Sequence, residues 1–308
     1  MKSTKTIIDS TTEFIPTHVF QGHNGPIYAI DFDDSYVYSA SADRFVTRWN
    51  KSTGKQDSFA IRCEAVPFTI QLFSLGKMLA IGLASGQVHI IDLEQKREIH
   101  HFTQHQAGIF SMFETNDKRL LCIGDADGFL SVWDTTTMKL LIILPLSCGK
   151  IRAIRQINQT KIVIAGGSGE VLILETEFFN ELNRFYAHET GATVLCLDPT
   201  RKELITGGKD GYLRWWDSET LSLKKALPAH KGSIYGLEFI DENHFVTVSL
   251  DKSVKIWNAV ERKVIHKITD KSIGHRRSVN TICSNGNGQF AYAGDDKLIH
   301  LFDFHKQD

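Results

Sequence analysis

Residues 204–217 read LITGGKDGYLRWWD: an apolar run leads to a turn residue, Asp210, and the bulky Trp216 follows six positions later. This arrangement occurs seven times in all along the 308-residue chain. Successive turn residues are separated by 42, 42, 41, 42, 41 and 45 residues. A period sustained from end to end predicts a repeat architecture. The seven turn residues are Asp43, Ser85, Asp127, Ser168, Asp210, Asp251 and Asp296.

Each repeat offers four short apolar or alternating segments separated by Gly, Asp, Asn and Ser turns, a pattern that favours β-strands. In the first repeat we expect strands at 27–32, 36–41, 45–49 and 56–61. Units of this kind pack side by side as the blades of a propeller, because a single blade leaves its apolar faces exposed. We predict an all-β fold, a seven-bladed β-propeller of four-stranded antiparallel blades.

The two ends of the chain are expected to meet. The last repeat has only three strands, of which Leu298 to Phe304 is the third, while a spare strand, Thr17 to Phe20, precedes the first repeat. We expect this N-terminal strand to pair in the last blade and close the ring, because an open ring would expose two sheet edges. The prediction is one domain over residues 1–308, with residues 1–12 as a flexible N-terminal extension.

Composition excludes several classes of function. Thirty-five basic and 36 acidic residues leave a net charge of −1 without a basic run, so nucleic acid is not expected as a partner. No apolar stretch approaches the roughly 18 residues of a membrane span, and the N-terminus lacks the apolar core of a secretory signal. Five widely spaced cysteines suit free thiols in a reducing compartment, so we expect a cytoplasmic protein.

Several repeats resemble the WD40 repeat family, beginning with Gly22-His23, Ser39, Asp43 and Trp49-Asn50. The resemblance extends over essentially the whole chain. It implies that a His, a strand Ser or Thr, the turn Asp and a Trp form a hydrogen-bonded quartet inside a blade. The residues that match are His23, Ser39, Asp43 and Trp49; His105, Asp127 and Trp133; His188, Thr206, Asp210 and Trp216; His230, Thr247, Asp251 and Trp257; and His275 and Asp296.

Four repeats depart from this pattern. The third has Ile123 where the hydroxyl is expected, and the seventh has Tyr292 and Phe302 in place of the hydroxyl and the Trp. The second and fourth have no recognisable His, so we expect apolar packing to hold those blades. His, Asp and Ser or Thr also make catalytic triads, but three complete copies at one offset favour a structural role, and no enzyme activity is expected.

A second candidate site is the run that contains His100, His101 and His105. Adjacent strand residues point to opposite faces, so His100 and His101 cannot easily share an ion, and His105 belongs to a quartet. We therefore favour solvated or packed histidines over a zinc site, and we expect no metal and no cofactor.

The innermost strands supply the candidate interaction residues. Counting five residues past each quartet His reaches a position that, by the family resemblance, points towards the top of the central channel. The apolar strand pattern supplies the equivalents in the two repeats that lack His. Aromatic residues and an Arg around a mouth suit a binding surface, although the aromatics alone would also serve as a plug. The seven residues are Tyr28, Phe68, Phe110, Arg152, Thr193, Tyr235 and Asn280.

One insertion adds to this face. The interval from the bulky position to the next His is longest before His275, and the extra residues lie around Thr269 to Gly274. Loops on a rigid scaffold often carry recognition, although a neutral insertion is equally compatible with the pattern.

These observations lead to a non-enzymatic scaffold for protein–protein interaction that binds a peptide or partner domain on its top face. The chain would act alone or as a subunit of a larger complex. The alternative is an enzyme or small-ligand sensor that uses the central channel. The fold by itself does not decide between them, because one scaffold serves many functions.

Overall fold

The computed structural model describes residues 6–9, 12–198, 200–268 and 275–306, and every regular element within them is a β-strand. The predicted insertion around Thr269 to Gly274 lies outside the described residues. The chain divides into two compact units, one formed by residues 1–62 with 230–308 and the other by residues 63–229. Among the described residues, no helix has the length and apolarity needed to cross a membrane.

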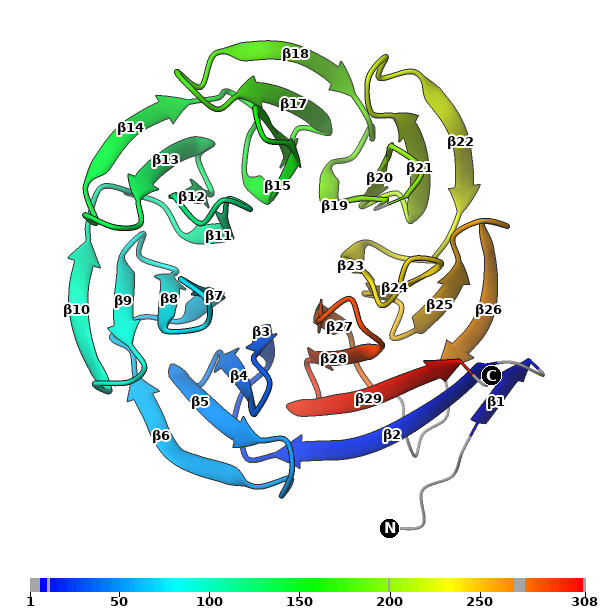
Figure 1. Cartoon of the computed structure of the whole chain (residues 1–308), viewed down its shortest axis with the longest axis horizontal. Helices are drawn as coiled ribbons and strands as arrows, with labels where there is room; N and C mark the ends of the chain where they lie inside the picture. The colour runs from blue at the N-terminus through cyan, green and yellow to red at the C-terminus, as the bar shows by residue number, and fades with distance from the viewer. Residues whose placement is uncertain (1–5, 10–11, 199, 269–274, 307–308) are drawn as a thin grey trace. The chain divides into compact units, whose positions relative to one another are not determined.

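The unit of residues 63–229 consists of four consecutive four-stranded antiparallel blades (Figure 1). In each blade the chain runs from the innermost strand to the outermost one. The strands are β7 (Pro67–Phe73), β8 (Met78–Leu83), β9 (Val88–Asp92) and β10 (Arg97–Phe102); β11 (Ile109–Glu114), β12 (Leu120–Asp125), β13 (Phe129–Asp134) and β14 (Leu140–Pro145); β15 (Ile151–Asn158), β16 (Lys161–Gly166), β17 (Glu170–Glu175) and β18 (Glu181–Tyr186); and β19 (Ala192–Leu197), β20 (Glu203–Gly208), β21 (Tyr212–Asp217) and β22 (Leu223–Pro228).

The other unit contains the remaining three blades. The first blade is β3 (Ile27–Phe32), β4 (Tyr36–Ser41), β5 (Phe45–Asn50) and β6 (Gln56–Arg62). The sixth is β23 (Ile234–Phe239), β24 (His244–Ser249), β25 (Val254–Asn258) and β26 (Lys263–Ile268). The seventh is β27 (Val279–Ser284), β28 (Gln289–Gly294) and β29 (Leu298–Lys306), joined by strands from the N-terminus. The fold is the predicted seven-bladed β-propeller.

The N-terminal strand completes the seventh blade, as predicted. β2 (Thr12–Gln21) pairs antiparallel with β29, and Phe20 lies opposite Ile299. The Thr17 hydroxyl also donates to the Leu301 carbonyl at 2.9 Å. β1 (Thr6–Asp9) pairs in turn with β2 and makes this sheet five-stranded. β1 lies within residues 1–12, where the sequence analysis expects an N-terminal extension, and it pairs with the edge of β2 that β29 leaves free.

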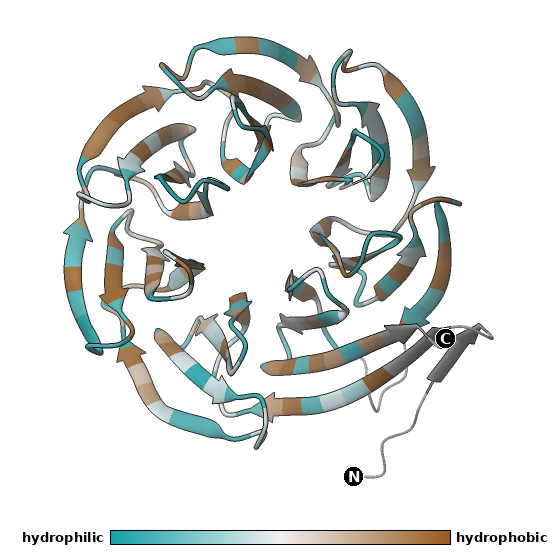
Figure 2. Ribbon diagram, in the orientation of Figure 1, coloured by the Kyte–Doolittle hydropathy of each residue, from teal (hydrophilic) through white to brown (hydrophobic). Residues whose placement is uncertain are grey.

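The apolar cores lie between neighbouring blades of the same unit. One core joins Leu130 and Val132 of β13 to Ile162 and Leu172 of the next blade, and all four side chains are fully buried. This follows from the repeat, since each blade covers one apolar face of its neighbour. Figure 2 shows that hydrophobic residues also dominate the outer strand β14, whereas β10 alternates between hydrophilic and hydrophobic residues.

Every blade has an end at which its second strand turns into its third, and we call it the turn end. The seven turn residues of the sequence repeat lie there, directly before β5, β9, β13, β17, β21, β25 and β29. The innermost strand of each blade also begins at this end, as shown by the pairing of Ile27 with Ser41 and of Pro67 with Leu83. The turn ends therefore carry both the candidate quartets and the candidate interaction residues.

Candidate functional site

The first blade contains a closed hydrogen-bonded quartet. His23 Nδ1 lies 2.9 Å from Asp43 Oδ2, and His23 Nε2 lies 2.8 Å from Ser39 Oγ. Trp49 Nε1 donates to the same Ser39 oxygen at 2.8 Å, and Thr47 Oγ1 lies 3.1 Å from it. An ionised carboxylate only accepts hydrogen bonds, so His23 donates from Nδ1 and its Nε2 accepts from a hydroxyl. Every polar group in the network has a partner.

The fifth and sixth blades repeat this geometry. His188 lies 3.0 Å from Asp210 and 2.9 Å from Thr206 Oγ1, which also accepts from Trp216 Nε1 at 2.9 Å. The sixth blade has the matching contacts at 3.2, 2.7 and 2.9 Å. Its four residues are His230, Asp251, Thr247 and Trp257.

The third blade requires a correction. His105 Nδ1 bonds to Asp125 Oδ2 at 2.8 Å and not to the predicted Asp127. Asp125 ends β12 and is buried, and its other oxygen accepts from the backbone N–H of Asp127 at 3.0 Å. The missing hydroxyl is present as Ser131, which lies 2.7 Å from His105 Nε2 and accepts from Trp133 Nε1 at 2.9 Å. Asp127 is exposed at the turn.

This quartet draws its hydroxyl from the third strand of the blade instead of the second. Ile123 on β12 lies opposite Ser131 on β13, just as Ser39 lies opposite Thr47 in the first blade. Both strand positions reach the imidazole, because paired residues of adjacent strands share one face of the sheet. The signal for Ser131 in the sequence is its place four residues after the turn residue, where Thr47 stands in the first repeat.

The seventh blade has an incomplete quartet. His275 bonds through Nδ1 to Asp296 at 2.5 Å, but within the described residues its buried Nε2 has no hydrogen-bond partner. The rings of Tyr292 and Phe302 occupy the positions of the hydroxyl and the Trp. His300 stacks 5.4 Å from Tyr292, and its Nε2 is likewise buried without a hydrogen-bond partner in the described part of the chain.

The quartets of the first, fifth and sixth blades favour a neutral imidazole and an ionised carboxylate. Burial lowers the pKa of His23 and His230, and it lowers the pKa of His188 to about 4. Burial alone would raise the pKa of Asp43, but hydrogen bonds from the Asn24 backbone and from His23 hold it below its ordinary value. The bridging hydroxyls are fully buried, so a substrate cannot reach them, and this geometry supports a structural role. They are Ser39, Ser131, Thr206 and Thr247.

Three of the predicted interaction residues within 63–229 lie together with Lys150 in a cluster of aromatic and cationic side chains. The rings of Phe68 and Phe110 lie 4.8 Å apart at an angle of 31°, and both are half-buried. Lys150 Nζ stands 3.8 Å from the centre of the Phe110 ring, and Arg152 Cζ stands 5.4 Å from it. We call Phe68, Phe110, Lys150 and Arg152 the aromatic–cation cluster.

The cluster carries an excess of positive charge. Burial lowers the pKa of Lys150, and repulsion from Arg152 and from Lys209 lowers it further. Lys209 is exposed, and its aliphatic stem lies over the backbone of Gly191, which has a φ of +127°. The sequence analysis did not single out Lys150, although its place two residues before Arg152 puts both side chains on one side of an extended chain.

The other predicted interaction residues differ in what they present. Tyr28 and Tyr235 are half-buried on the innermost strands of their blades. The Asn280 amide donates to the Ile27 carbonyl at 3.0 Å and to Asp295 at 2.7 Å, so it fastens β27 to β3. The buried Thr193 hydroxyl donates to the Gly207 carbonyl at 3.0 Å. The polar groups of these last two residues therefore have partners within the protein.

The candidate metal cluster of the sequence analysis does not assemble. His105 lies in its quartet, and His100 pairs with Ile90 on the opposite face of β10 from His101. His101 instead stacks on His89, with ring centres 4.4 Å apart and an angle of 13°.

Comparison with known families agrees with this geometry. The family profile described as "WD domain, G-beta repeat" matches residues 14–50, 179–217, 221–258 and 265–303. The profile described as "Anaphase-promoting complex subunit 4 WD40 domain" matches residues 69–116. The chain belongs to the WD40 repeat family. The segments matched by the WD-domain profile lie in the first, fifth and sixth blades, which have complete quartets, and in the seventh blade, whose quartet is incomplete.

Individual WD40 relatives are distant. The chain is 20% identical to a striatin homolog of Dictyostelium discoideum, over 94% of the chain and 35% of that protein. It is 24% identical to human cilia- and flagella-associated protein 52, over 94% of the chain and 47% of that protein. The match to an Aedes aegypti homolog of ribosome biogenesis protein WDR12 is 25% identical, over 63% of the chain and 51% of that protein. The chain thus spans between about a third and a half of these relatives.

Proposed function

We propose that this WD40 protein is a non-enzymatic scaffold that binds a peptide or a partner domain at the turn ends of its blades. The observation that carries the proposal is the aromatic–cation cluster, in which two half-buried rings lie beside two cations. Exposed aromatic and Arg side chains dominate binding energies at protein interfaces, because they offer large rigid area and directed donors. Tyr28 and Tyr235 add aromatic area at the turn ends of their own blades.

The chemistry of the cluster favours an acidic partner segment. Arg152 and Lys150 would pair with carboxylates, and the Phe68 and Phe110 rings would pack against a bulky apolar side chain next to them. The relatives include proteins named for ribosome biogenesis and for cilia and flagella, so the names of the relatives do not select one process for this chain. All five cysteines are free, which supports the cytoplasm as the proposed location.

The proposal is tested with a displayed library of random peptides. Enriched peptides are measured by fluorescence anisotropy against the wild type, Arg152→Ala and Arg155→Ala. The last variant is the matched control, because Arg155 lies on the same strand and its guanidinium donates to the Ile154 carbonyl. We expect acidic peptides with a bulky apolar residue, and a loss of affinity of about tenfold or more in Arg152→Ala alone. Equal binding by all three proteins would reject the cluster as the site.

A further inference from the structure

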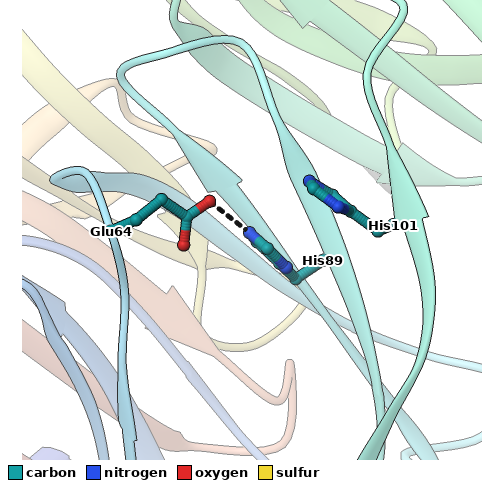
Figure 3. A group of neighbouring side chains, drawn as sticks. All are labelled: Glu64, His89 and His101. Atoms are coloured by element: carbon teal, nitrogen blue, oxygen red, sulfur yellow. Dashed lines mark hydrogen bonds and ion pairs between the residues drawn. The ribbon is translucent and has the colours of Figure 1, made fainter.

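A second group of chemically capable side chains lies at the turn end of the second blade. Glu64 comes from the segment just before β7, His89 from β9 and His101 from β10 (Figure 3). His89 and His101 are register partners on adjacent antiparallel strands, so their side chains project from one face of the sheet. The fold therefore brings Glu64 and His89 next to His101, although they lie 37 and 12 positions before it in the sequence.

The ligand atoms of the three side chains lie close together. Glu64 Oε1 lies 2.9 Å from His89 Nε2, and the available donor atoms of all three residues lie within 4.8 Å of one another. Figure 3 shows the Glu64 carboxylate facing the His89 ring, with the His101 ring stacked alongside. Two imidazole nitrogens and one carboxylate oxygen are a common set of ligands for zinc, at about 2.0–2.2 Å from the ion.

A second carboxylate orients the central histidine. Glu98 Oε1 lies 3.2 Å from His89 Nδ1, on the side of the ring away from Glu64. In zinc proteins a carboxylate beside the outer ring nitrogen of a ligating histidine orients the ring towards the ion. Glu98 is placed to orient the His89 ring in this way, with Nε2 on the side of Glu64.

We propose that Glu64, His89 and His101 bind a zinc ion, with Glu98 positioning His89. Donor atoms on a tetrahedral zinc ion lie about 3.3 Å apart, so the Glu64 carboxylate must move slightly away from His89 Nε2. The His101 ring must also turn out of its nearly parallel stack on His89 to direct a nitrogen at the ion. Both residues are exposed and have room to do so. Three protein ligands leave the fourth position to a water molecule. Mg²⁺ and Ca²⁺ are excluded by ligand chemistry, since they prefer sites made only of oxygen.

Without an ion, His89 contacts both carboxylates: Nε2 lies 2.9 Å from Glu64 and Nδ1 lies 3.2 Å from Glu98. Substitution of His101 distinguishes a zinc site from a simple contact between Glu64 and His89. It removes one ligand of the zinc site and leaves the Glu64–His89 contact in place.

The experiment titrates zinc chloride into chelator-treated full-length protein by calorimetry. His101→Ala is compared with His100→Ala, a matched control that removes the neighbouring exposed imidazole on the other face of β10. We expect one zinc ion per chain, retained by His100→Ala, lost in His101→Ala and weakened about 10- to 100-fold in Glu98→Gln. Cobalt chloride should give the intense visible absorption of a four-coordinate ion, and magnesium chloride should give no binding.

Two outcomes would overturn the proposal. One is the absence of saturable zinc binding in the wild type. The other is equal binding by His100→Ala and His101→Ala, which would place the ion elsewhere on the protein. Because Glu64 and His101 are exposed, their substitutions leave the apolar core intact, and a circular dichroism spectrum verifies that each variant is folded.

Discussion

His300 should make the protein sensitive to acid well above the range in which carboxylates titrate. Its side chain on β29 is almost completely buried, and Nε2 has no hydrogen-bond partner among the described residues. Burial lowers the pKa of His300 from 6.5 to about 3, with a further contribution from His275 nearby. The imidazole is therefore neutral in the folded protein and readily protonated once the chain unfolds.

The sign of the effect follows from proton linkage. Between pH 6.5 and about 3 the unfolded state binds the proton and the folded state does not. The stability contributed by a neutral His300 is therefore complete above pH 6.5 and falls as the pH decreases towards 3. At about 1.36 kcal/mol per pH unit, the free energy of unfolding should fall by about 2 kcal/mol by pH 5 through this residue alone.

Substitution of His300 by Phe removes the titrating group and keeps an aromatic ring beside Tyr292 and Phe302. Urea unfolding followed by tryptophan fluorescence gives the free energy at pH 7.5 and at pH 5 for each protein. We expect the difference between the two pH values to be about 2 kcal/mol smaller in His300→Phe than in the wild type. Any loss from repacking occurs at both pH values and cancels in the difference.

The exposed His100 provides the control, since His100→Phe also removes one imidazole from the chain. That variant should keep the pH dependence of the wild type. Some acid sensitivity remains in every protein, because the lowered pKa values of His23, His188 and His230 act in the same direction. An unchanged pH dependence in His300→Phe would refute the conclusion that the fold holds this imidazole neutral.

Three further predictions follow from the fold. Asp125→Ala should lower the free energy of unfolding by at least about 2 kcal/mol, whereas Asp127→Ala should change it by less than about 0.5 kcal/mol, as measured by urea unfolding. Gly169→Ala should be more destabilising than Gly76→Ala in thermal unfolding, because a Cβ at the first would lie 1.8 Å from a backbone carbonyl oxygen and at the second would meet nothing within 4 Å. Deletion of residues 1–21 removes β2 and exposes the edge of β29, so the shortened chain should melt lower and associate at high concentration in sedimentation experiments.

The strands were predictable from the sequence because their signal is local. Alternating apolar residues and turn residues define β3 and β4 to the residue, and β5 and β6 to within one residue at their ends. The pairing of β2 with β29 was also predictable, since a spare strand at one end of the chain matches a missing strand at the other. The repeat supplies the register, so even a distant pairing could be inferred.

The quartet predictions failed where a side chain from a different sequence position fills the expected role. Asp125 takes the place of Asp127 because both lie near the same turn and either carboxylate could approach His105. Ser131 takes the place of a hydroxyl on β12 because β12 and β13 present their paired side chains on one face. Counting along one strand cannot detect an exchange between two strands. The same limitation hid Glu64 and His89, which meet His101 only through the packing of the blade.

His89, one of the proposed zinc ligands, occupies a repeat position that holds a polar side chain in other blades. His89 stands four residues after its turn residue, at the position of Thr47 in the first repeat and Ser131 in the third. Those hydroxyls belong to buried quartets, whereas the side chains of Glu64 and Glu98 are 51% and 46% exposed. An ion pair that is this exposed contributes at most about 1 kcal/mol, so the cluster cannot replace a quartet as a source of stability. If the second blade is held by apolar packing, as the buried Leu79, Ile81 and Val88 indicate, its polar position is released from the structural role and is available to bind a metal.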